Sequence, residues 1–239
     1  MMNFEGKNIL VVGGSSGIGL SLVRLLALNG ATVYNISRTE HADWPQGIRH
    51  LSMDVLDEVS NMADFLPEQL HGLVYSVGSI TLKPFNRLTE EDFLNDYRIN
   101  VLGAARTIQQ SVKNLKNAGA SSIVLISSVA AKTGMPYHAS VAAAKAALEG
   151  MGLSLAAEFT AQQIRVNVVA PSLTDTPLSQ YLLSSPEKRE ASAKRHPLGK
   201  IGQPEDISSL IAFLLSEQSN WITGQVISVD GGLGKLKTS

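Results

Sequence analysis

Near its N-terminus the chain has a glycine-rich turn with residue types that bind phosphate. The stretch VVGGSSGIG, residues 11–19, follows an apolar run and opens a helical pattern. Glycines at 13, 17 and 19 let the backbone turn tightly and approach a pyrophosphate. The helix N-terminus then supplies free N–H groups and a positive dipole end. The expected chemistry is dinucleotide binding by six residues of this turn: Gly13, Ser15, Ser16, Gly17, Ile18 and Gly19.

Ser37 and Arg38, which follow the second apolar run, bear on the choice of nucleotide. A carboxylate at this place would accept hydrogen bonds from the ribose hydroxyls of NAD and would repel a 2′-phosphate. A hydroxyl and a guanidinium suit a phosphate better. We therefore predict NADP as the cofactor in preference to NAD. The alternative is that Arg38 is an ordinary solvated surface charge.

The elements that must position these residues alternate between short apolar runs and longer helical patterns. The apolar runs are nearly continuous, which indicates strands buried on both faces, as in a parallel sheet. Strands are predicted at residues 8–13, 31–37, 49–54, 72–77, 122–127, 164–170 and 225–230. Helices are predicted from Gly19 to Gly30, from a Thr89–Asp92 capping box onward, over 138–162, and from Pro204 to 216.

This alternation predicts an α/β fold of one domain over residues 1–239. The expected architecture is a Rossmann-like, doubly wound parallel sheet of about seven strands with helices on both faces. Residues 172–203 form the one long segment without a predicted strand. Its length favours a segment that covers a cleft as a lid. The alternative is an ordinary surface loop. Four of its apolar side chains suggest a partly apolar substrate or simply pack on the sheet: Leu178, Tyr181, Leu182 and Leu183.

The composition argues against several classes of function. The formal charge is -1 and the chain has no run of Lys or Arg, so we expect neither nucleic acid nor a membrane as partner. It has no cysteine, which excludes disulfides and thiolate metal sites, and we predict no metal site. No segment approaches the ~18 apolar residues of a membrane span. We expect a soluble, cytoplasmic protein.

Six motifs distributed over nearly the whole chain resemble the short-chain dehydrogenase/reductase family, with similarity to its 3-oxoacyl-thioester reductases. They are GGSSGIG at 13–19, MDV at 53–55, IN at 99–100, LISS at 125–128, IRVNVVAP at 164–171 and ITGQVISVDGG at 222–232. The resemblance implies NAD or NADP as cofactor and a homotetramer of single-domain subunits. It also implies oxidation or reduction at a carbinol or carbonyl of a small molecule.

The same resemblance implies how the cofactor is held. Asp54 would hold the adenine amino group, Val55 would offer backbone contacts, and Thr176 would reach the nicotinamide amide or a phosphate. Further contacts are expected from Ser76, Gly78, Asn100, Lys145, Pro171 and Thr174. The chain departs from the family at Val12, usually Thr, at YSVG (75–78), usually Asn-Asn-Ala-Gly, and at Ser172, usually Gly. Because Tyr75 and Ser76 are polar, we expect altered contacts rather than lost binding.

In relatives a Ser, a Tyr, a Lys and an Asn act together. By resemblance, Ser128 hydrogen-bonds the substrate oxygen, Lys145 holds the nicotinamide ribose, and Asn100 positions a water for proton relay. The tyrosine would lie thirteen residues after Ser128 and four before Lys145, where the chain has Val141. A general acid contributes about 10²- to 10⁴-fold, whereas positioning of the reactants acts independently. The substitution therefore predicts an impaired enzyme.

Tyr137 and His138 are possible substitute acids. On a continued helix Tyr137 would share a face with Val141, and His138 can carry a proton near neutral pH. Pro136 indicates instead that the helix begins here, which leaves both directions open. An aromatic residue before a helix is also more often a packing residue.

Two main functions follow. The first is an NADP-dependent oxidoreductase that interconverts a carbonyl and an alcohol on a small or acyl-chain substrate, impaired or atypical for lack of the general-acid Tyr. The alternative is a catalytically silent NADP-binding protein acting as sensor, scaffold or partner subunit. A third reading is a natural or engineered knockout of an ordinary reductase. Retention of Ser128, Lys145 and Asn100 and the intact nucleotide-binding end favour the first. Val141, the altered YSVG at 75–78 and Ser172 after Pro171 favour the silent protein.

Overall fold

The computed structural model describes residues 2–57 and 62–237 and contains one parallel sheet of seven strands. The strand order is β3-β2-β1-β4-β5-β6-β7, so the winding direction reverses between β1 and β4. The strands are β1 (Asn8–Val12), β2 (Thr32–Ser37), β3 (Arg49–Ser52), β4 (Gly72–Tyr75), β5 (Ser121–Ile126), β6 (Ile164–Pro171) and β7 (Val226–Val229). Each lies within two residues of its predicted bounds, and the predicted fold class is confirmed.

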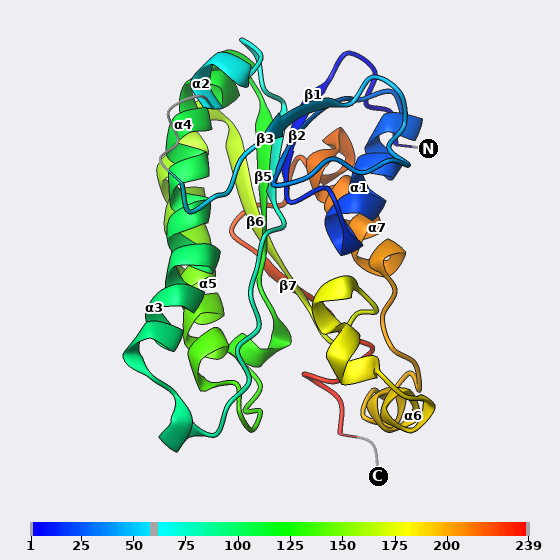
Figure 1. The fold of residues 1–239 in the computed structure, drawn as a ribbon. Coiled ribbons are helices and arrows are strands. Elements are labelled where there is room, and N and C mark those ends of the chain that lie inside the picture. The colour runs from blue at the N-terminus through cyan, green and yellow to red at the C-terminus, as the bar shows by residue number, and fades with distance from the viewer. Residues whose placement is uncertain (1, 58–61, 238–239) are drawn as a thin grey trace.

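Helices cover both faces of the sheet (Figure 1), with α4 and α5 on one face and α1 and α7 on the other. The helices are α1 (Gly17–Leu28), α2 (Met62–Phe65), α3 (Glu90–Tyr97), α4 (Gly103–Asn117), α5 (Ala139–Phe159), α6 (Pro186–Lys194) and α7 (Pro204–Leu215). No helix in the described residues is long and apolar enough to cross a membrane.

Alternation along each strand divides the core into two clusters. On β1, Leu10 and Val12 pack with the α4 and α5 side, whereas Ile9 and Val11 pack with α1 and α7. Successive side chains of a strand point to opposite faces, and both faces are buried here. This explains why the strands are continuous apolar runs in the sequence.

The segment that leads into the catalytic region is capped as predicted. Thr89 Oγ1 accepts a hydrogen bond from Asp92 N at 3.2 Å, and Asp92 Oδ2 accepts one from Thr89 N at 2.9 Å. From this capping box α3 runs through a π-helical turn, Arg98–Leu102, into α4. Such turns often occur at functional sites, and this one carries Asn100.

Three predicted boundaries differ from the structure. α1 begins at Gly17 rather than after Gly19 and ends at Leu28. α5 begins at Ala139, because Tyr137 has a left-handed φ of 70°, and ends at Phe159 before a 3₁₀ turn. Residues 172–203 are not an irregular loop: they hold a 3₁₀ helix, Pro177–Leu183, and α6. Each of these begins with a proline, which favours the first turn of a helix.

Candidate functional site

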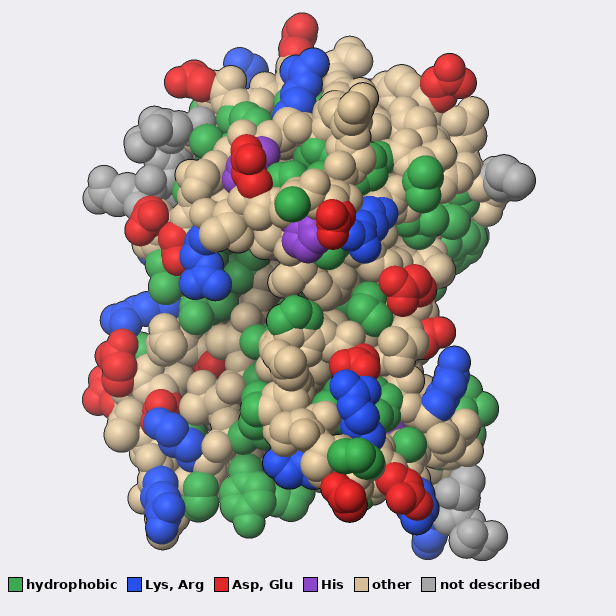
Figure 2. Space-filling model, turned by 45° about the vertical axis from the view of Figure 1, so that its right-hand side comes forward, with side chains coloured by type: hydrophobic (Ala, Val, Ile, Leu, Met, Phe, Trp, Pro, Cys, Tyr) green, Lys and Arg blue, Asp and Glu red, His purple; other side chains and the backbone are tan. Residues whose placement is uncertain are grey.

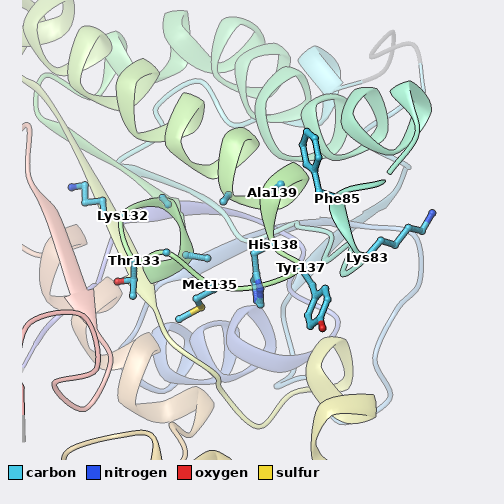
Figure 3. Close-up of a pocket in the computed structure, with 12 residues that line it drawn as sticks. Lys83, Phe85, Lys132, Thr133, Met135, Tyr137, His138 and Ala139 are labelled. Carbon is cyan, nitrogen blue, oxygen red and sulfur yellow. The ribbon is translucent and has the colours of Figure 1, made fainter. Parts of the chain in front are cut away.

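A cleft of about 640 Å³ opens at the carboxyl ends of the strands. Its walls come from the segments that follow β1, β2, β3, β4, β5 and β6, and from residues 172–182 and 195–196 above them. In an open parallel sheet this is where ligands bind, next to the point where the winding reverses. A smaller hollow of about 340 Å³ adjoins it and shares Ala130, Met135 and His138 with it (Figure 3).

The glycine-rich turn forms the floor of one end of the cleft. Gly13 and Gly17 have left-handed φ values of 92° and 51°, and a side chain at Gly19 would overlap the carbonyl oxygen of Gly13. Ser16, the N-cap of α1, makes no side-chain capping bond, which leaves N–H groups of the first turn of α1 for a ligand. Glycine conformation and helix dipole together fit a pyrophosphate.

Two neighbouring strand ends supply the residues expected around the adenosine. Ser37 is buried and its hydroxyl donates to the carbonyl oxygen of Thr39 at 2.9 Å. Arg38 is exposed at the rim of the cleft. Asp54 and Val55, after β3, line the same end. The donors and acceptors present fit the adenosine and phosphate groups of a dinucleotide.

The cleft is also lined by Ser76, Gly78, Pro171, Thr174 and Thr176, from which the sequence predicts further cofactor contacts. The Thr174 hydroxyl is buried and donates to the carbonyl oxygen of Ser172 at 3.0 Å, so this side chain serves the loop rather than a ligand. A side chain at Gly17 would lie 3.1 Å from Thr176, so the start of the lid segment already crosses the glycine turn.

Tyr75 does not make the cofactor contact that the sequence suggested. Its side chain is fully buried, and its hydroxyl donates to the carbonyl oxygen of Ile99 at 2.6 Å. Burial raises the pKa of this phenol above its ordinary range. Tyr75 therefore holds the π-helical turn against β4 and cannot point into the cleft.

Ser128 and Lys145 both line the cleft. Ser128 follows β5, and its Oγ accepts a hydrogen bond from Ala130 N at 3.2 Å, which leaves its own hydrogen for a ligand. Lys145 is buried on α5 and donates from Nζ to the carbonyl oxygen of Ile126 at 2.7 Å. Burial lowers the pKa of Lys145 to about 8, and the nearby Asp96 carboxylate opposes that shift.

Asn100 converges on the same point as Lys145. Its Nδ2 donates to Ser79 Oγ at 3.0 Å and to the carbonyl oxygen of Asp96 at 2.8 Å, while its buried Oδ1 has no partner among the described residues. A side chain at Gly78 would lie 3.2 Å from that Oδ1 and 3.3 Å from Lys145 Nζ. The orphaned oxygen beside a lysine fits a bound water.

Val141 lies in the wall of this cleft and is 4% exposed. Ser128, Val141 and Lys145 thus line the same cleft. Valine can pack against a substrate but cannot donate or accept a proton.

The two proposed substitute acids separate in the structure. Tyr137 is 60% exposed, does not line the cleft, and precedes α5, so the expectation that it shares the Val141 face on a continued helix is wrong. His138 lines the cleft as well as the neighbouring hollow (Figure 3). Its Nδ1 lies 2.7 Å from the carbonyl oxygen of Pro136 and must donate to it, so Nε2 is the nitrogen left for a ligand.

A buried carboxylate behind the cleft was missed by the sequence reasoning. Asp96 is fully buried and accepts hydrogen bonds from Ser79 Oγ at 2.6 Å, Thr81 Oγ1 at 3.1 Å and Ser140 Oγ at 2.7 Å. It joins α3 to the start of α5 and bonds the same serine as Asn100 does. The only sequence signal is its place one helical turn before Asn100.

A histidine in the cleft wall was missed as well. His196 is buried, and its Nε2 lies 2.7 Å from Ser172 Oγ. The sequence clue to this pair was Ser172 itself, which stands where the family usually has glycine. Its partner lies 24 residues away and is not predictable from spacing. Among the described residues no His, Cys, Asp and Glu side chains cluster in a way that could hold a metal ion.

Comparison with known proteins agrees with this geometry. Residues 12–234 match a family model described as enoyl-(acyl carrier protein) reductase. A 3-oxoacyl-[acyl-carrier-protein] reductase of Thermotoga maritima is 36% identical over 247 residues, which cover 97% of this chain and 99% of that protein.

The fold is also similar to solved structures of dehydrogenases and reductases. A short-chain type dehydrogenase/reductase from Mycobacterium ulcerans superposes with a TM-score of 0.89 at 28% identity, covering 98% of this chain and 91% of that one. ElxO with NADP bound superposes with a TM-score of 0.85 at 28% identity, covering 98% and 99%. A cleft lined by Ser128 and Lys145 lies where the winding reverses, with Asn100 buried beside Lys145, and the chain belongs to the short-chain dehydrogenase/reductase family of NAD(P)-dependent oxidoreductases.

Proposed function

We propose that the protein is an NADP-dependent oxidoreductase that interconverts a carbonyl and an alcohol on a small or acyl-chain substrate. One observation carries the proposal: Ser128, Lys145 and the glycine-rich turn line one cleft at the carboxyl ends of the strands. The 3-oxoacyl thioester reductase among the relatives and the NADP-bound neighbour support the substrate class and the cofactor.

NADP is favoured over NAD by the end of β2. The cleft there presents the Arg38 side chain beside Ser37. A guanidinium forms charge-assisted hydrogen bonds with a phosphate, whereas it offers nothing specific to a ribose diol. The glycine turn would take the pyrophosphate, and Asp54, Val55 and Thr176 would complete the site.

When bound, the reduced nicotinamide supplies a hydride to the substrate carbon. The chain's own residues bind and polarise the substrate. Ser128 would donate its free hydroxyl hydrogen to the substrate oxygen. The Lys145 ammonium would hold the nicotinamide ribose and lower the energy of negative charge developing on that oxygen. Asn100 Oδ1 would hold a water beside Lys145 Nζ. None of these roles needs a side chain at position 141.

The substrate is expected to be partly apolar. Leu178 and Leu182 of the lid segment line the cleft, whereas Leu183 is buried in the protein and Tyr181 is 50% exposed. Two of the four apolar side chains singled out in the sequence thus face the site.

The test is consumption of NADPH with a panel of ketones and 3-oxoacyl thioesters, measured for the native chain and for Val141→Tyr. We expect slow native turnover, raised by the tyrosine by up to about 10²-fold, the lower end of what a general acid contributes. Failure of both proteins to consume NADPH with any carbonyl would refute the proposed reductase.

The second candidate is a silent NADP-binding protein, a sensor, scaffold or partner subunit, and it is favoured by Val141, by the altered YSVG at 75–78 and by Ser172 after Pro171. It predicts that NADPH binds to the native chain and that only Val141→Tyr turns over. The same experiment therefore separates the two functions.

We further propose a homotetramer. Leu153 on α5 is 61% exposed and Trp221 is 96% exposed, on the side of the molecule where the edge strand β7 is open to a neighbour. Large exposed apolar side chains at an open sheet edge favour association. The cytoplasmic location stays a prediction from the composition.

A further inference from the structure

Ser172 and His196 form a hydrogen-bonded pair in the wall of the cleft. Ser172 Oγ lies 2.7 Å from His196 Nε2, and both residues line the cleft. The other ring nitrogen, Nδ1, lies 2.9 Å from the carbonyl oxygen of Ser192. A carbonyl can only accept, so Nδ1 carries a hydrogen in every state, and Nε2 is the nitrogen that gains and loses a proton.

This arrangement lets the charge on the ring control the serine. When His196 is neutral, Nε2 accepts the Ser172 hydrogen, and the hydroxyl has none to offer. When His196 is cationic, Nε2–H donates to Ser172 Oγ, and the serine hydrogen is free for a ligand. A serine and a histidine in hydrogen-bond contact, with the histidine oriented by a third group, is a recurrent arrangement for moving a proton.

The strand register places the pair at the reacting end of the cleft. Ile126 of β5 is paired with Val169 of β6, so Ser128 and Ser172 follow that pair by two and three residues. Neighbouring strands lie about 4.8 Å apart. Ser172 also stands between Pro171 and Thr174, both of which line the cleft.

Among the groups around His196, Ser172 is the one hydrogen-bonded to its Nε2. The side chain is 4% exposed, and a side chain at Gly231 would lie 3.5 Å from its Cβ. The charged groups on the elements around it are engaged elsewhere. Arg195 donates to Ser192 Oγ at 3.1 Å, and Asp230 accepts from Gly232 N and Gly234 N, each at 2.9 Å.

We propose that Ser172 and His196 are the proton donor that replaces the absent tyrosine. Cationic His196 passes its Nε2 proton to Ser172 Oγ, and Ser172 passes its own proton to the substrate oxygen as that carbon receives the hydride. A C–H and an O–H bond form, the C=O double bond becomes single, and NADPH is oxidised to NADP⁺. His196 is left neutral and regains a proton from water. In the oxidative direction the pair accepts the proton.

The inference rests on the proposed reductase function and deepens it. It also competes with His138, which lines the cleft from the segment before α5. His138 has no serine or other side chain hydrogen-bonded to its ring among the described residues. Ser172, in contrast, offers a hydroxyl on a strand end next to that of Ser128.

The test compares Ser172→Ala, His196→Gln and His138→Gln in the native chain and in the Val141→Tyr chain. In the native chain we expect Ser172→Ala and His196→Gln to lower kcat for NADPH-dependent reduction by about 10²-fold, and His138→Gln to lower it clearly less. In the Val141→Tyr chain all three should have little effect, because the tyrosine supplies the proton. Ser219→Ala and His71→Gln, both outside the cleft, control for loss of a buried serine and of a histidine.

A second readout needs no turnover. In the cofactor-free protein, NMR of the imidazole nitrogens should show the His196 Nε2 signal displaced by Ser172→Ala, while the Nδ1 signal, held by the carbonyl oxygen of Ser192, stays in place. An Nε2 signal that Ser172→Ala does not move would mean that the two side chains are not hydrogen-bonded, and it would overturn the proposal.

The kinetic outcomes are equally decisive. An equal loss in both chains would mean a structural role and refute the donor, as would a loss confined to His138→Gln. Turnover by Val141→Tyr alone would refute the donor and support the silent protein. Absence of turnover in every chain would first refute the reductase itself, and the donor with it.

Discussion

Among single residues, Arg38 should decide which dinucleotide binds. Its guanidinium is exposed at the rim of the cleft, where a 2′-phosphate would lie. A hydrogen bond to a charged group contributes about 1.5–3 kcal/mol, so Arg38→Ser should weaken NADPH binding by about 10- to 100-fold. NADH binding should change little. Calorimetric titration of both nucleotides checks this, and an equal loss for both would contradict the assignment of NADP.

Lys145 should make stability depend on pH in a characteristic way. Its pKa is about 8 in the folded chain against an ordinary value of 10.5. Between these values the unfolded chain binds a proton that the folded chain has lost, so raising the pH favours the folded state. The native chain should therefore gain about 3 kcal/mol over Lys145→Met between pH 8 and 10.5. That gain is lost as the pH falls through 8.

Urea unfolding of both proteins at several pH values gives the measurement. Other groups titrate over the same range, but they do so equally in the two chains, so the difference isolates Lys145. Parallel curves for the native chain and Lys145→Met would contradict a lowered pKa.

Sequence reasoning found those site residues whose roles depend on local spacing. Ser128, Val141 and Lys145 follow one another over 17 residues and meet in the cleft as predicted. Asp96 and His196 could not be found this way. Their partners Ser140 and Ser172 are 44 and 24 residues distant, and only the folded sheet brings them into contact.

At the scale of elements, the joint between β1 and α1 should tolerate no side chain at position 19. An added Cβ there would overlap the carbonyl oxygen of Gly13 in the phosphate-binding turn. Gly19→Ala must therefore displace that turn, and we expect NADPH binding to be lost. Gly6→Ala is the control, since Gly6 lies on the other side of β1, has a φ of 71°, and has nothing within 4 Å of an added Cβ.

Calorimetry with NADPH and thermal unfolding report on the two variants together. Gly6→Ala should lose some stability from its left-handed backbone while binding NADPH normally. Normal binding by Gly19→Ala would show that the turn is not closely packed.

Which segments form helices and which form strands was predictable, because the spacing of apolar residues and the capping residues are local features of the sequence. The Thr89–Asp92 capping box and the nearly continuous apolar runs of the buried strands illustrate this. The start of α5 was not fixed by such signals. It depends on the left-handed conformation of Tyr137, whose backbone oxygen accepts a hydrogen bond from Lys83 N at 3.2 Å, a contact between distant segments.

For the whole molecule, charges of both signs are interspersed over the face shown in Figure 2, which fits assembly through apolar rather than ionic contacts. Trp221→Glu should therefore dissociate the proposed tetramer into smaller species in sedimentation velocity. A charge placed in an apolar contact is strongly unfavourable. Lys116→Glu is the control. It lies at the exposed end of α4 and makes the net charge more negative by two, whereas Trp221→Glu makes it more negative by one. A native chain that sediments as a monomer would contradict the tetramer outright.

The positions of the two tryptophans have a practical consequence. Trp44 donates from Nε1 to the carbonyl oxygen of Gly14 at 3.0 Å, directly behind the phosphate-binding turn, whereas Trp221 stands free on the outer surface. The chain has no other tryptophan. Its intrinsic fluorescence therefore contains two separate reporters. Energy transfer from Trp44 to a reduced nicotinamide would signal occupancy of the cleft, and the emission colour of Trp221 would signal burial between subunits, both without an added label.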